Sequence, residues 1–252
     1  KIPNAAALYI AKVGQPIGMM YGALTDGLYQ YEDFRKGSDG SWILRDDVVS
    51  QSTHANRKGV IPGNQKFKDL NVDLQITQED LTIIGTPNPD FTGGITNTFR
   101  FYNFDMSLFF TFSYGNDILN MNRYYLEEGR SLSSNQFASY ADRWTVDNPN
   151  GKLPRARSAN NTAWGSDRYV EDGSYLRLKN LNIGYTLPVQ VSQRFFVSNM
   201  RIYFSAQNLF TVTGYSGQDP TVSTMSNART PGYDYSAYPV PRTFIFGAQI
   251  SF

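Results

Sequence analysis

The sequence predicts an all-β fold, in particular part of an antiparallel β-barrel that crosses a membrane. Three observations favour it. Apolar and polar residues alternate along stretches of about ten residues, aromatic residues make up 15% of the 252-residue chain, and short connections alternate with long ones. No apolar run approaches the ~20 residues of a membrane-spanning helix. A strand of ~9–11 residues crosses a bilayer without such a run, because every second residue is polar.

The composition also restricts the possible functions. The 21 glycines and 12 prolines are spread along the chain, as strands joined by turns require. Cysteine is absent, which excludes disulfides, thiolate nucleophiles and Cys-ligated metals. The single histidine, His54, argues against multi-His zinc sites and His-based triads. A net charge of +1 provides no basic surface for nucleic acid.

Six strands are expected, and the first three precede the middle of the chain. A weak strand covers residues 15–21. Residues 92–102 and 104–114 form a hairpin that turns at Tyr102 and Asn103. Since side chains alternate between the faces of a strand, the apolar residues of this hairpin share one face of each strand: Ile95, Phe99 and Phe101, then Met106, Leu108, Phe110, Phe112 and Tyr114.

The last three strands repeat this alternation. In residues 174–188 the apolar phase slips by one residue near Asn180, which predicts a β-bulge. In residues 201–212 an apolar face opposes Arg201, Ser205 and Gln207. Residues 243–252 give a ten-residue alternation whose apolar face consists of Phe244, Phe246, Ala248, Ile250 and Phe252.

The lengths of the connections predict an orientation. The turn at Tyr102 and Asn103 is tight and residues 188–199 form a moderate connection, whereas residues 22–91, 115–173 and 213–242 are long. Compact soluble domains rarely contain several loops longer than ~15 residues, but outer-membrane barrels combine short periplasmic turns with long extracellular loops. A C-terminus in the periplasm makes every long loop extracellular.

Six strands would leave two open sheet edges, which a bilayer does not tolerate. The remaining strands are therefore expected from sequence outside this chain. The first residues, KIPNAAALYI, also lack the pattern of a secretory signal, so we expect the chain to begin inside a longer polypeptide.

Four long segments carry a family resemblance. They are KDLNVDLQITQEDLTIIGTPNPDFTGGITNTFRFYNFDMSLFFTFSYGNDI, DGSYLRLKNLNIGYTLP, RIYFSAQNLFTVTGYSGQDP and YPVPRTFIFGAQISF. In this order they resemble the C-terminal part of SusC/RagA-type TonB-linked outer-membrane receptors of Bacteroidota. The resemblance covers most of the chain, from about residue 63 to residue 252.

The resemblance implies a barrel of about 22 strands, of which residues 1–252 would be the C-terminal part, without the N-terminal plug and the earlier strands. It implies a place in the outer membrane, import of oligosaccharides or peptides, and a SusD-like surface lipoprotein as partner. The TonB–ExbB–ExbD system would supply energy through the N-terminal part, and the barrel-assembly machinery would insert the protein.

One polar segment has the spacing of a calcium loop. Asp69, Asn71, Asp73, Gln75, Thr77 and Asp80 occupy positions 1, 3, 5, 7, 9 and 12 of an EF-hand-like loop. Leu74 replaces the usual glycine at position 6, and Asp80 is shorter than the usual glutamate at position 12. The resembling receptors often read DLNGDG here, so the NVDL stretch departs from the family pattern. A solvated loop whose Asp and Asn side chains hold turns is the alternative.

Two further groups of residues are candidates for function. Aromatic side chains in the expected extracellular loops could stack on sugar rings or pack the loops together: Trp144, Trp164, Tyr169, Tyr215, Tyr233, Tyr235 and Tyr238. At the end of the chain, Phe244, Phe246, Ile250 and Phe252 resemble the C-terminal signal that the barrel-assembly machinery reads, and they would later face lipid.

The sequence also bears on two other classes of protein. An enzyme is not expected, because no carboxylate pair is fixed at the ~5–9.5 Å that glycoside hydrolysis needs; the acidic residues considered are Asp90, Asp105, Asp117, Glu127 and Glu128. A soluble β-sandwich carbohydrate-binding module is the alternative to the importer. It would share the aromatic residues and the alternation, but not the alternating lengths of the connections.

Overall fold

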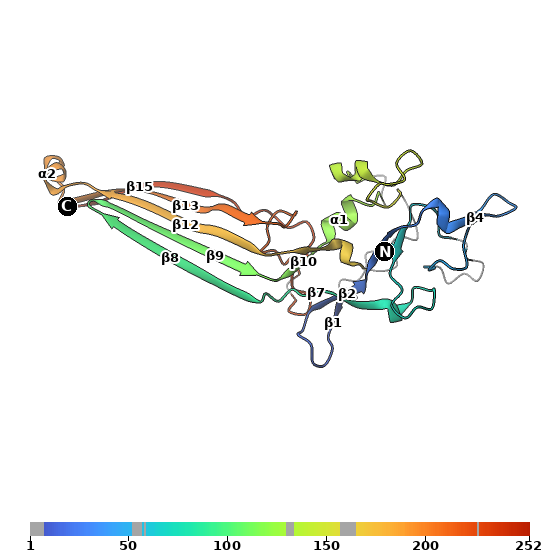
Figure 1. Cartoon of the computed structure of the whole chain (residues 1–252). Helices are drawn as coiled ribbons and strands as arrows, with labels where there is room; N and C mark the ends of the chain where they lie inside the picture. The colour runs from blue at the N-terminus through green and yellow to red at the C-terminus, as the bar shows by residue number, and fades with distance from the viewer. Residues whose placement is uncertain (1–7, 52–56, 58, 130–133, 157–164, 226) are drawn as a thin grey trace. The chain divides into compact units, whose positions relative to one another are not determined.

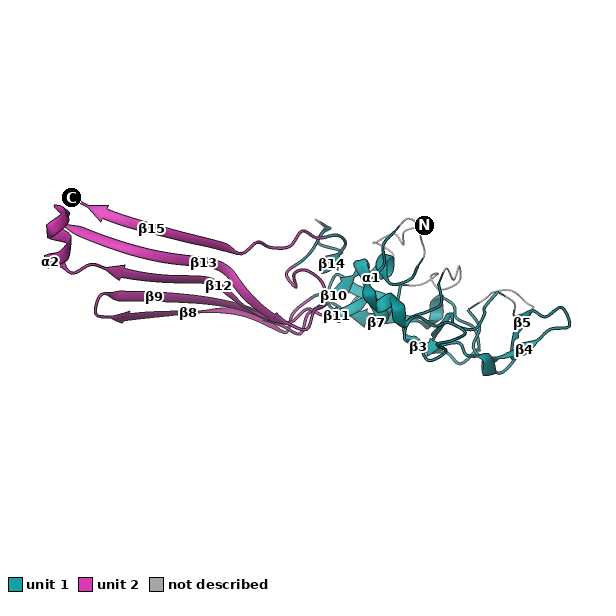
Figure 2. Ribbon diagram, turned by 90° about the horizontal axis from the view of Figure 1, so that it is seen from above, with its two compact units in different colours: residues 1–87, 117–171, 222–236 teal, residues 88–116, 172–221, 237–252 magenta. Residues whose placement is uncertain are grey.

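The computed structural model describes residues 8–51, 57, 59–129, 134–156, 165–225 and 227–252. The fold is all-β: the two α-helices are short, α1 (Met121–Leu126) and α2 (Val189–Ser192). Among the described residues, no helix is long and apolar enough to cross a membrane. The chain divides into two compact units (Figure 2). Unit 1 comprises residues 1–87, 117–171 and 222–236, and unit 2 comprises residues 88–116, 172–221 and 237–252.

Unit 2 is a five-stranded antiparallel sheet (Figure 1). In chain order its strands are β8 (Phe91–Phe101), β9 (Phe104–Tyr114), β12 (Tyr175–Thr186), β13 (Asn199–Thr213) and β15 (Thr243–Ser251). They are 9 to 15 residues long, and their order across the sheet is β15-β13-β12-β9-β8. The C-terminus, the α2 connection and the β8–β9 turn lie at one end of the sheet. The long connections leave from the other end, as the sequence predicted.

The strand register gives this sheet two chemically different faces. Ile95, Phe110, Leu178 and Phe210 form one cross-strand row, and this side of the sheet is termed the apolar face. Its other large members are Phe91, Phe99, Phe101, Phe104, Met106, Leu108, Phe112, Tyr114, Leu176, Leu181, Ile183, Tyr185, Met200, Ile202, Phe204, Val212, Phe244, Phe246 and Ile250.

The opposite side is termed the polar face. Thr98, Ser107, Asn182 and Ser205 form one of its cross-strand rows. The two rows belong to opposite sides because side chains one residue apart in a strand point in opposite directions. Residues such as Phe109 and Ile245 interrupt the polar face, so the apolar and polar residues are separated at most positions of the sheet but not at all of them.

The predicted bulge is confirmed. The register of β12 against both neighbours shifts between Leu178 and Asn180. Strand β12 has one more residue than β9 at this level, and β13 has one more than β12, because Leu178 pairs with Phe210 and Asn180 pairs with Gln207. In β13 the irregularity includes Asn208, whose φ is 51°. Asparagine tolerates this left-handed conformation better than most residues.

Unit 1 consists of short strands around buried side chains. Two three-stranded sheets have the orders β1-β2-β7 and β11-β10-β14, and two strand pairs are β3-β6 and β4-β5. The strands are β1 (Tyr9–Ile10), β2 (Met19–Ala23), β3 (Thr25–Leu28), β4 (Phe34–Lys36), β5 (Trp42–Leu44), β6 (Gln65–Phe67), β7 (Leu81–Gly85), β10 (Asp117–Asn120), β11 (Val170–Asp172) and β14 (Tyr233–Asp234). Three apolar clusters hold the unit together, the largest around Met20, Leu119 and Tyr124.

The prediction of a sixth strand in the large sheet was wrong. Residues 15–21 overlap β2, which pairs with β1 and β7 in unit 1. Four of the five β2 residues are buried, so both faces of the strand pack against protein. A strand of five residues is also too short to cross a bilayer. The long connections, expected to lack regular structure, contain the strands of unit 1 other than β1 and β2.

Candidate functional site

The apolar face of unit 2 is exposed within the chain. Phe246 is 80% exposed, Phe101 71% and Phe91 55%. Soluble monomers rarely expose contiguous apolar patches larger than a few hundred Å², whereas here the patch extends over five strands. The face therefore needs an apolar environment that the described residues do not supply.

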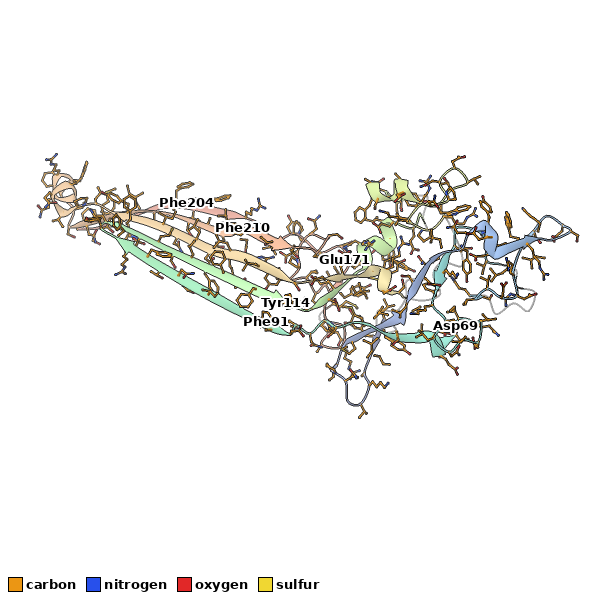
Figure 3. The ribbon with its side chains drawn as sticks, in the orientation of Figure 1. Asp69, Phe91, Tyr114, Glu171, Phe204 and Phe210 are labelled. Carbon is orange, nitrogen blue, oxygen red and sulfur yellow. The ribbon has the colours of Figure 1, made fainter. Side chains whose placement is uncertain are left out.

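Aromatic rings mark both ends of the apolar face. At one end Phe91 stacks on Tyr114 with ring centroids 5.2 Å apart, and Figure 3 shows the two at adjoining ends of β8 and β9. At the other end Phe104 lies 4.6 Å from Tyr185. Aromatic residues at both edges of an apolar band are typical of strands that cross an outer membrane.

The polar face carries an ion pair that crosses a strand. Arg201 on β13 binds Asp105 on β9 through Nε at 3.0 Å and Nη2 at 2.5 Å. Strand β12 lies between them, and Gly184 of β12 is directly opposite Asp105. A Cβ atom on Gly184 would collide with the Arg201 guanidinium. Glycine at this position therefore lets the arginine reach across β12.

A second ion pair holds a connection against the polar face. Arg177 on β12 donates from Nη2 to Asp219 at 2.7 Å, and both side chains are 8% exposed. Burial raises the pKa of Asp219, but hydrogen bonds from Thr221 and Arg177 outweigh it and leave the pKa below its usual range. The connection after β13 is thus fixed to the sheet by a buried, charge-assisted contact.

In the loop predicted to bind calcium, the carboxylates accept hydrogen bonds from backbone N–H groups of the same loop. Asp69 accepts the N–H groups of Val72 and Leu74 at 2.7 Å each. Asp80, which is fully buried, accepts those of Leu70 at 2.8 Å and Thr77 at 2.7 Å. These are contacts of the turn-forming alternative. Among the described residues, no group of three His, Cys, Asp or Glu side chains is placed to hold a metal. Calcium binding by this loop stays a prediction.

The candidate stacking aromatics fall into three groups. Trp144, Tyr169, Tyr215 and Tyr233 are at most 6% exposed and pack inside the protein; Trp144, for example, donates from Nε1 to Gln30 at 3.2 Å. Tyr235 and Tyr238 are exposed, and Tyr235 lies 4.9 Å from Tyr125. Trp164 lies outside the described residues. A stacking role stays a prediction, and among the described candidates Tyr235 and Tyr238 are the two with exposed rings.

Comparison with known proteins identifies the chain. No family model matches it. TonB-dependent receptor P3 of Formosa agariphila is 38% identical over 248 residues, which cover 96% of this chain and 23% of that protein. TonB-dependent receptor SusC of Bacteroides thetaiotaomicron is 26% identical over 196 residues, covering 76% of this chain and 18% of SusC. The structure of the RagAB peptide transporter matches all of this chain and 24% of its own, with 25% identity and a TM-score of 0.70.

This chain belongs with the SusC/RagA-like TonB-dependent receptors. It spans about a quarter of the length of the relatives and solved structures it matches. The relatives are receptors and a transporter rather than enzymes, which is consistent with the expectation from sequence.

In this receptor chain three of the five acidic residues weighed as catalytic candidates have structural partners. Asp105 binds Arg201, Asp117 accepts the N–H of Thr86, and Glu127 accepts from Arg123 and Ser139. His54 lies outside the described residues.

The C-terminal strand of the receptor chain lies at an edge of the sheet. Phe244, Phe246 and Ile250 lie on the apolar face, and Phe252 follows β15 and is 95% exposed. The side chains predicted to form an assembly signal are thus accessible together. Recognition by the assembly machinery stays a prediction.

Proposed function

We propose that the protein imports a nutrient across the outer membrane, and that the sheet of unit 2 is part of the wall of its barrel. The observation that carries the proposal is the chemical difference between the two faces of one sheet. Strands of 9 to 15 residues are long enough to cross a bilayer. The apolar face would contact lipid, and the polar face would line the interior of the barrel.

The physics of a bilayer supports the proposal of a closed barrel. An unpaired strand edge in hydrocarbon leaves backbone N–H and C=O groups without partners, which costs several kcal/mol for each group. Strands β8 and β15 are the outer strands of the sheet in this chain. We propose that further strands of the receptor pair with both edges, in a barrel of about 22 strands. The short connections would then be periplasmic and the long ones extracellular.

The names of the relatives support a proposal for the partners and the cargo. Their names support coupling to TonB, and RagAB is described as a peptide transporter. We propose that a SusD-like lipoprotein covers the extracellular side, that TonB–ExbB–ExbD drives transport through the N-terminal part, and that the cargo is an oligosaccharide or a peptide. The exposed side chains of β15 and Phe252 would engage the barrel-assembly machinery.

The alternative, a soluble β-sandwich carbohydrate-binding module, would need a second sheet packed on the apolar face. Among the described residues no such sheet covers it: the other sheets belong to unit 1 and consist of strands of two to five residues. This observation favours the membrane protein.

The proposal can be tested on the full-length receptor in its native cells. Outer-membrane fractionation should recover it in the detergent-resistant fraction. Its mobility on a gel should change when the sample is boiled. It should co-purify with a surface lipoprotein, and deletion of its gene should abolish uptake of one class of nutrient. Recovery as a soluble, monomeric sugar-binding protein would instead support the β-sandwich module.

A further inference from the structure

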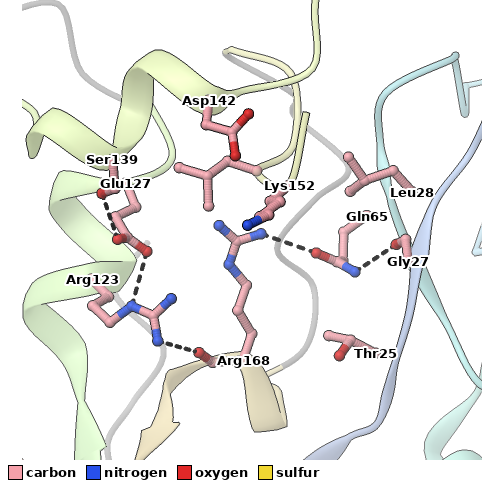
Figure 4. A pocket seen from close by; sticks show the side chains of 11 residues that line it. Thr25, Gly27, Leu28, Gln65, Arg123, Glu127, Ser139, Asp142, Lys152 and Arg168 are labelled. Carbon is pink, nitrogen blue, oxygen red and sulfur yellow. Dashed lines mark hydrogen bonds and ion pairs between the residues drawn. The ribbon is translucent and has the colours of Figure 1, made fainter. Parts of the chain in front are cut away.

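A polar pocket lies entirely within unit 1 (Figure 4). Its volume is about 510 Å³, within the range of sites that take small ligands. Its lining contains three cationic side chains, those of Arg123, Arg168 and Lys152, and two acidic ones, those of Glu127 and Asp142.

The charges of the pocket are not all paired alike. Arg123 is bound to Glu127 at 2.9 Å and to Glu171 at 3.4 Å. Figure 4 shows Arg168 in the middle of the pocket, with Lys152 extending toward the same space. Asp142 is the other carboxylate of the lining, and the charges of Glu128 and Glu127 also act on Arg168.

Arg168 uses only part of its hydrogen-bonding capacity. Its Nη1 donates to Gln65 Oε1 at 3.1 Å, but its Nε and Nη2 are buried and have no hydrogen-bond partner among the described residues. Burial lowers the pKa of Arg168, although the charges of Glu128 and Glu127 partly oppose this effect. A buried charged donor without a partner is costly, so native structures rarely leave one without a role.

The same edge of the guanidinium binds carboxylates elsewhere in this chain. Arg201 holds Asp105 through Nε and Nη2, and Arg45 holds Asp47 through the same two atoms at 3.1 and 2.9 Å. These parallel N–H groups match the two oxygens of one carboxylate. Arg168 has the same two N–H groups, but no carboxylate of the described residues is hydrogen-bonded to them.

We infer that this pocket binds a carboxylate group of the imported molecule, with Arg168 as its bidentate partner and Lys152 as a second cation. The inference rests on the proposed import function and specifies its cargo. Because the Nε–Nη2 edge is buried in this structure, the proposal requires the Arg168 side chain to change conformation before a carboxylate can reach it. The carboxylate can belong to a uronic-acid sugar or to the C-terminus of a peptide, and binding measurements distinguish these sources.

The test uses the full-length receptor, purified from outer membranes with any lipoprotein that accompanies it. Isothermal titration compares two matched pairs of probes. Trigalacturonate is compared with neutral galactotriose, and trialanine is compared with trialanine amide. We expect the carboxylate member of one pair to bind at least tenfold more tightly than its neutral counterpart. The pair that shows the preference identifies the source of the carboxylate.

Three variants connect the preference to the pocket. Arg168→Gln should reduce it to less than twofold, whereas Arg168→Lys should retain part of it, since a lysine keeps the charge but loses the fork. Lys152→Gln, a change at an exposed position, should reduce it two- to fivefold without endangering the fold. Arg45→Gln is the control, because Arg45 also binds a carboxylate but lies outside the pocket, and it should leave the preference unchanged.

Two results would overturn the inference. One is equal binding of charged and neutral probes by the wild-type receptor, and the other is a preference that survives Arg168→Gln and Lys152→Gln. Uptake of the natural nutrient by cells is measured in parallel. Intact uptake without any carboxylate preference would disprove the inference and leave the import function standing, whereas loss of membrane localisation and uptake would disprove the function itself.

Discussion

The two units of this chain differ in the exposure of their apolar side chains. In unit 1, Met20, Tyr29 and Leu119 are completely or almost completely buried, and the strands of this unit are short. In unit 2 the strands are long, yet Phe101 and Phe246 are among the most exposed large side chains. Unit 1 has the interior of a water-soluble domain, whereas unit 2 has its polar groups on one face and its apolar groups open on the other.

This difference indicates that the two units need different surroundings. Burial of apolar surface away from water contributes about 25 cal/mol per Å², and unit 1 obtains this contribution within the chain. The apolar face of unit 2 can obtain it only from hydrocarbon or from another protein surface. Polar contacts such as Arg201–Asp105 and Arg177–Asp219 lie on the opposite face, so the stability of unit 2 should depend on them and on the surroundings of its apolar face.

The largest effect is expected at the buried ion pair of unit 2. Asp219→Asn leaves the Arg177 guanidinium buried without its counterion, and removal of one partner of such a pair costs about 3–5 kcal/mol. The urea midpoint of the full-length receptor in detergent should fall accordingly. Asp47→Asn removes a carboxylate from the exposed Arg45–Asp47 pair and should leave the midpoint unchanged. Equal midpoints for the two variants would show that the polar face contributes little to stability.

A charge on the apolar face should have the next largest effect. Leu181 and Asn182 are neighbours in the middle of β12 and belong to the apolar and polar face respectively. Arginine near the middle of a bilayer costs about 2–4 kcal/mol on a lipid-facing position, so Leu181→Arg should reduce the folded fraction in liposomes, as read from gel mobility. Asn182→Arg should fold normally. If both variants fold equally well, the two faces do not meet different solvents.

The alternation of residues predicted unit 2 well. The hairpin turn at Tyr102 and Asn103, five long strands and the bulge near Asn180 were all predicted, because one property, the side-chain period of two, defines the whole sheet. Unit 1 was not predicted. Its strands have two to five residues, too few for a period to be recognised, and β7 shows only a short apolar run. Its arrangement depends on contacts such as those of Met20 with residues about a hundred positions away.

The candidate sites were harder to predict for the same reason. The spacing of Asp69 to Asp80 matched a calcium loop, but spacing does not reveal that Val72 and Leu74 donate backbone N–H groups to Asp69. Aromatic residues in loops could not be sorted into buried and exposed. Arg168 carried no signal, because the residues around it come from parts of the chain up to about 140 positions apart.

The third prediction concerns acidity in unit 1. Burial raises the pKa of Asp80, but N–H groups of Thr77 and Leu70 outweigh it, so its pKa lies below the ordinary 3.8. The folded state therefore favours the charged carboxylate, and its contribution is complete above pH 3.8 and lost as the pH falls toward the lower folded value. Hydrogen bonds to a charged group contribute about 1.5–3 kcal/mol.

Asp80→Asn should therefore destabilise the protein by about this amount at pH 7, where the wild type has its full contribution. At acidic pH the two proteins should become similar in stability. The measurement is urea denaturation of the full-length receptor between pH 2.5 and pH 7, followed by proteolysis within residues 69–80. If the difference in free energy of unfolding between wild type and variant stays constant with pH, the charge of Asp80 has no role in stability.

The smallest effect is expected from the backbone of the same loop. Val72 and Leu74 have φ values of 62° and 63°, a left-handed conformation that costs non-glycine residues about 1–3 kcal/mol each. Glycine removes this strain, but the greater conformational freedom that it gives the unfolded chain destabilises the folded state by about 0.5–1 kcal/mol. Val72→Gly and Leu74→Gly should thus each stabilise the receptor by about 1 kcal/mol in urea denaturation.

Leu70→Gly is the matched control, since Leu70 lies in the same loop without a left-handed backbone and glycine there should only destabilise. Calcium titration of the double variant V72G/L74G then separates the two interpretations of the loop. If calcium raises the urea midpoint of the double variant but not that of the wild type, the loop can bind metal and the two bulky residues prevent it. If calcium affects neither, the carboxylates serve the turn alone.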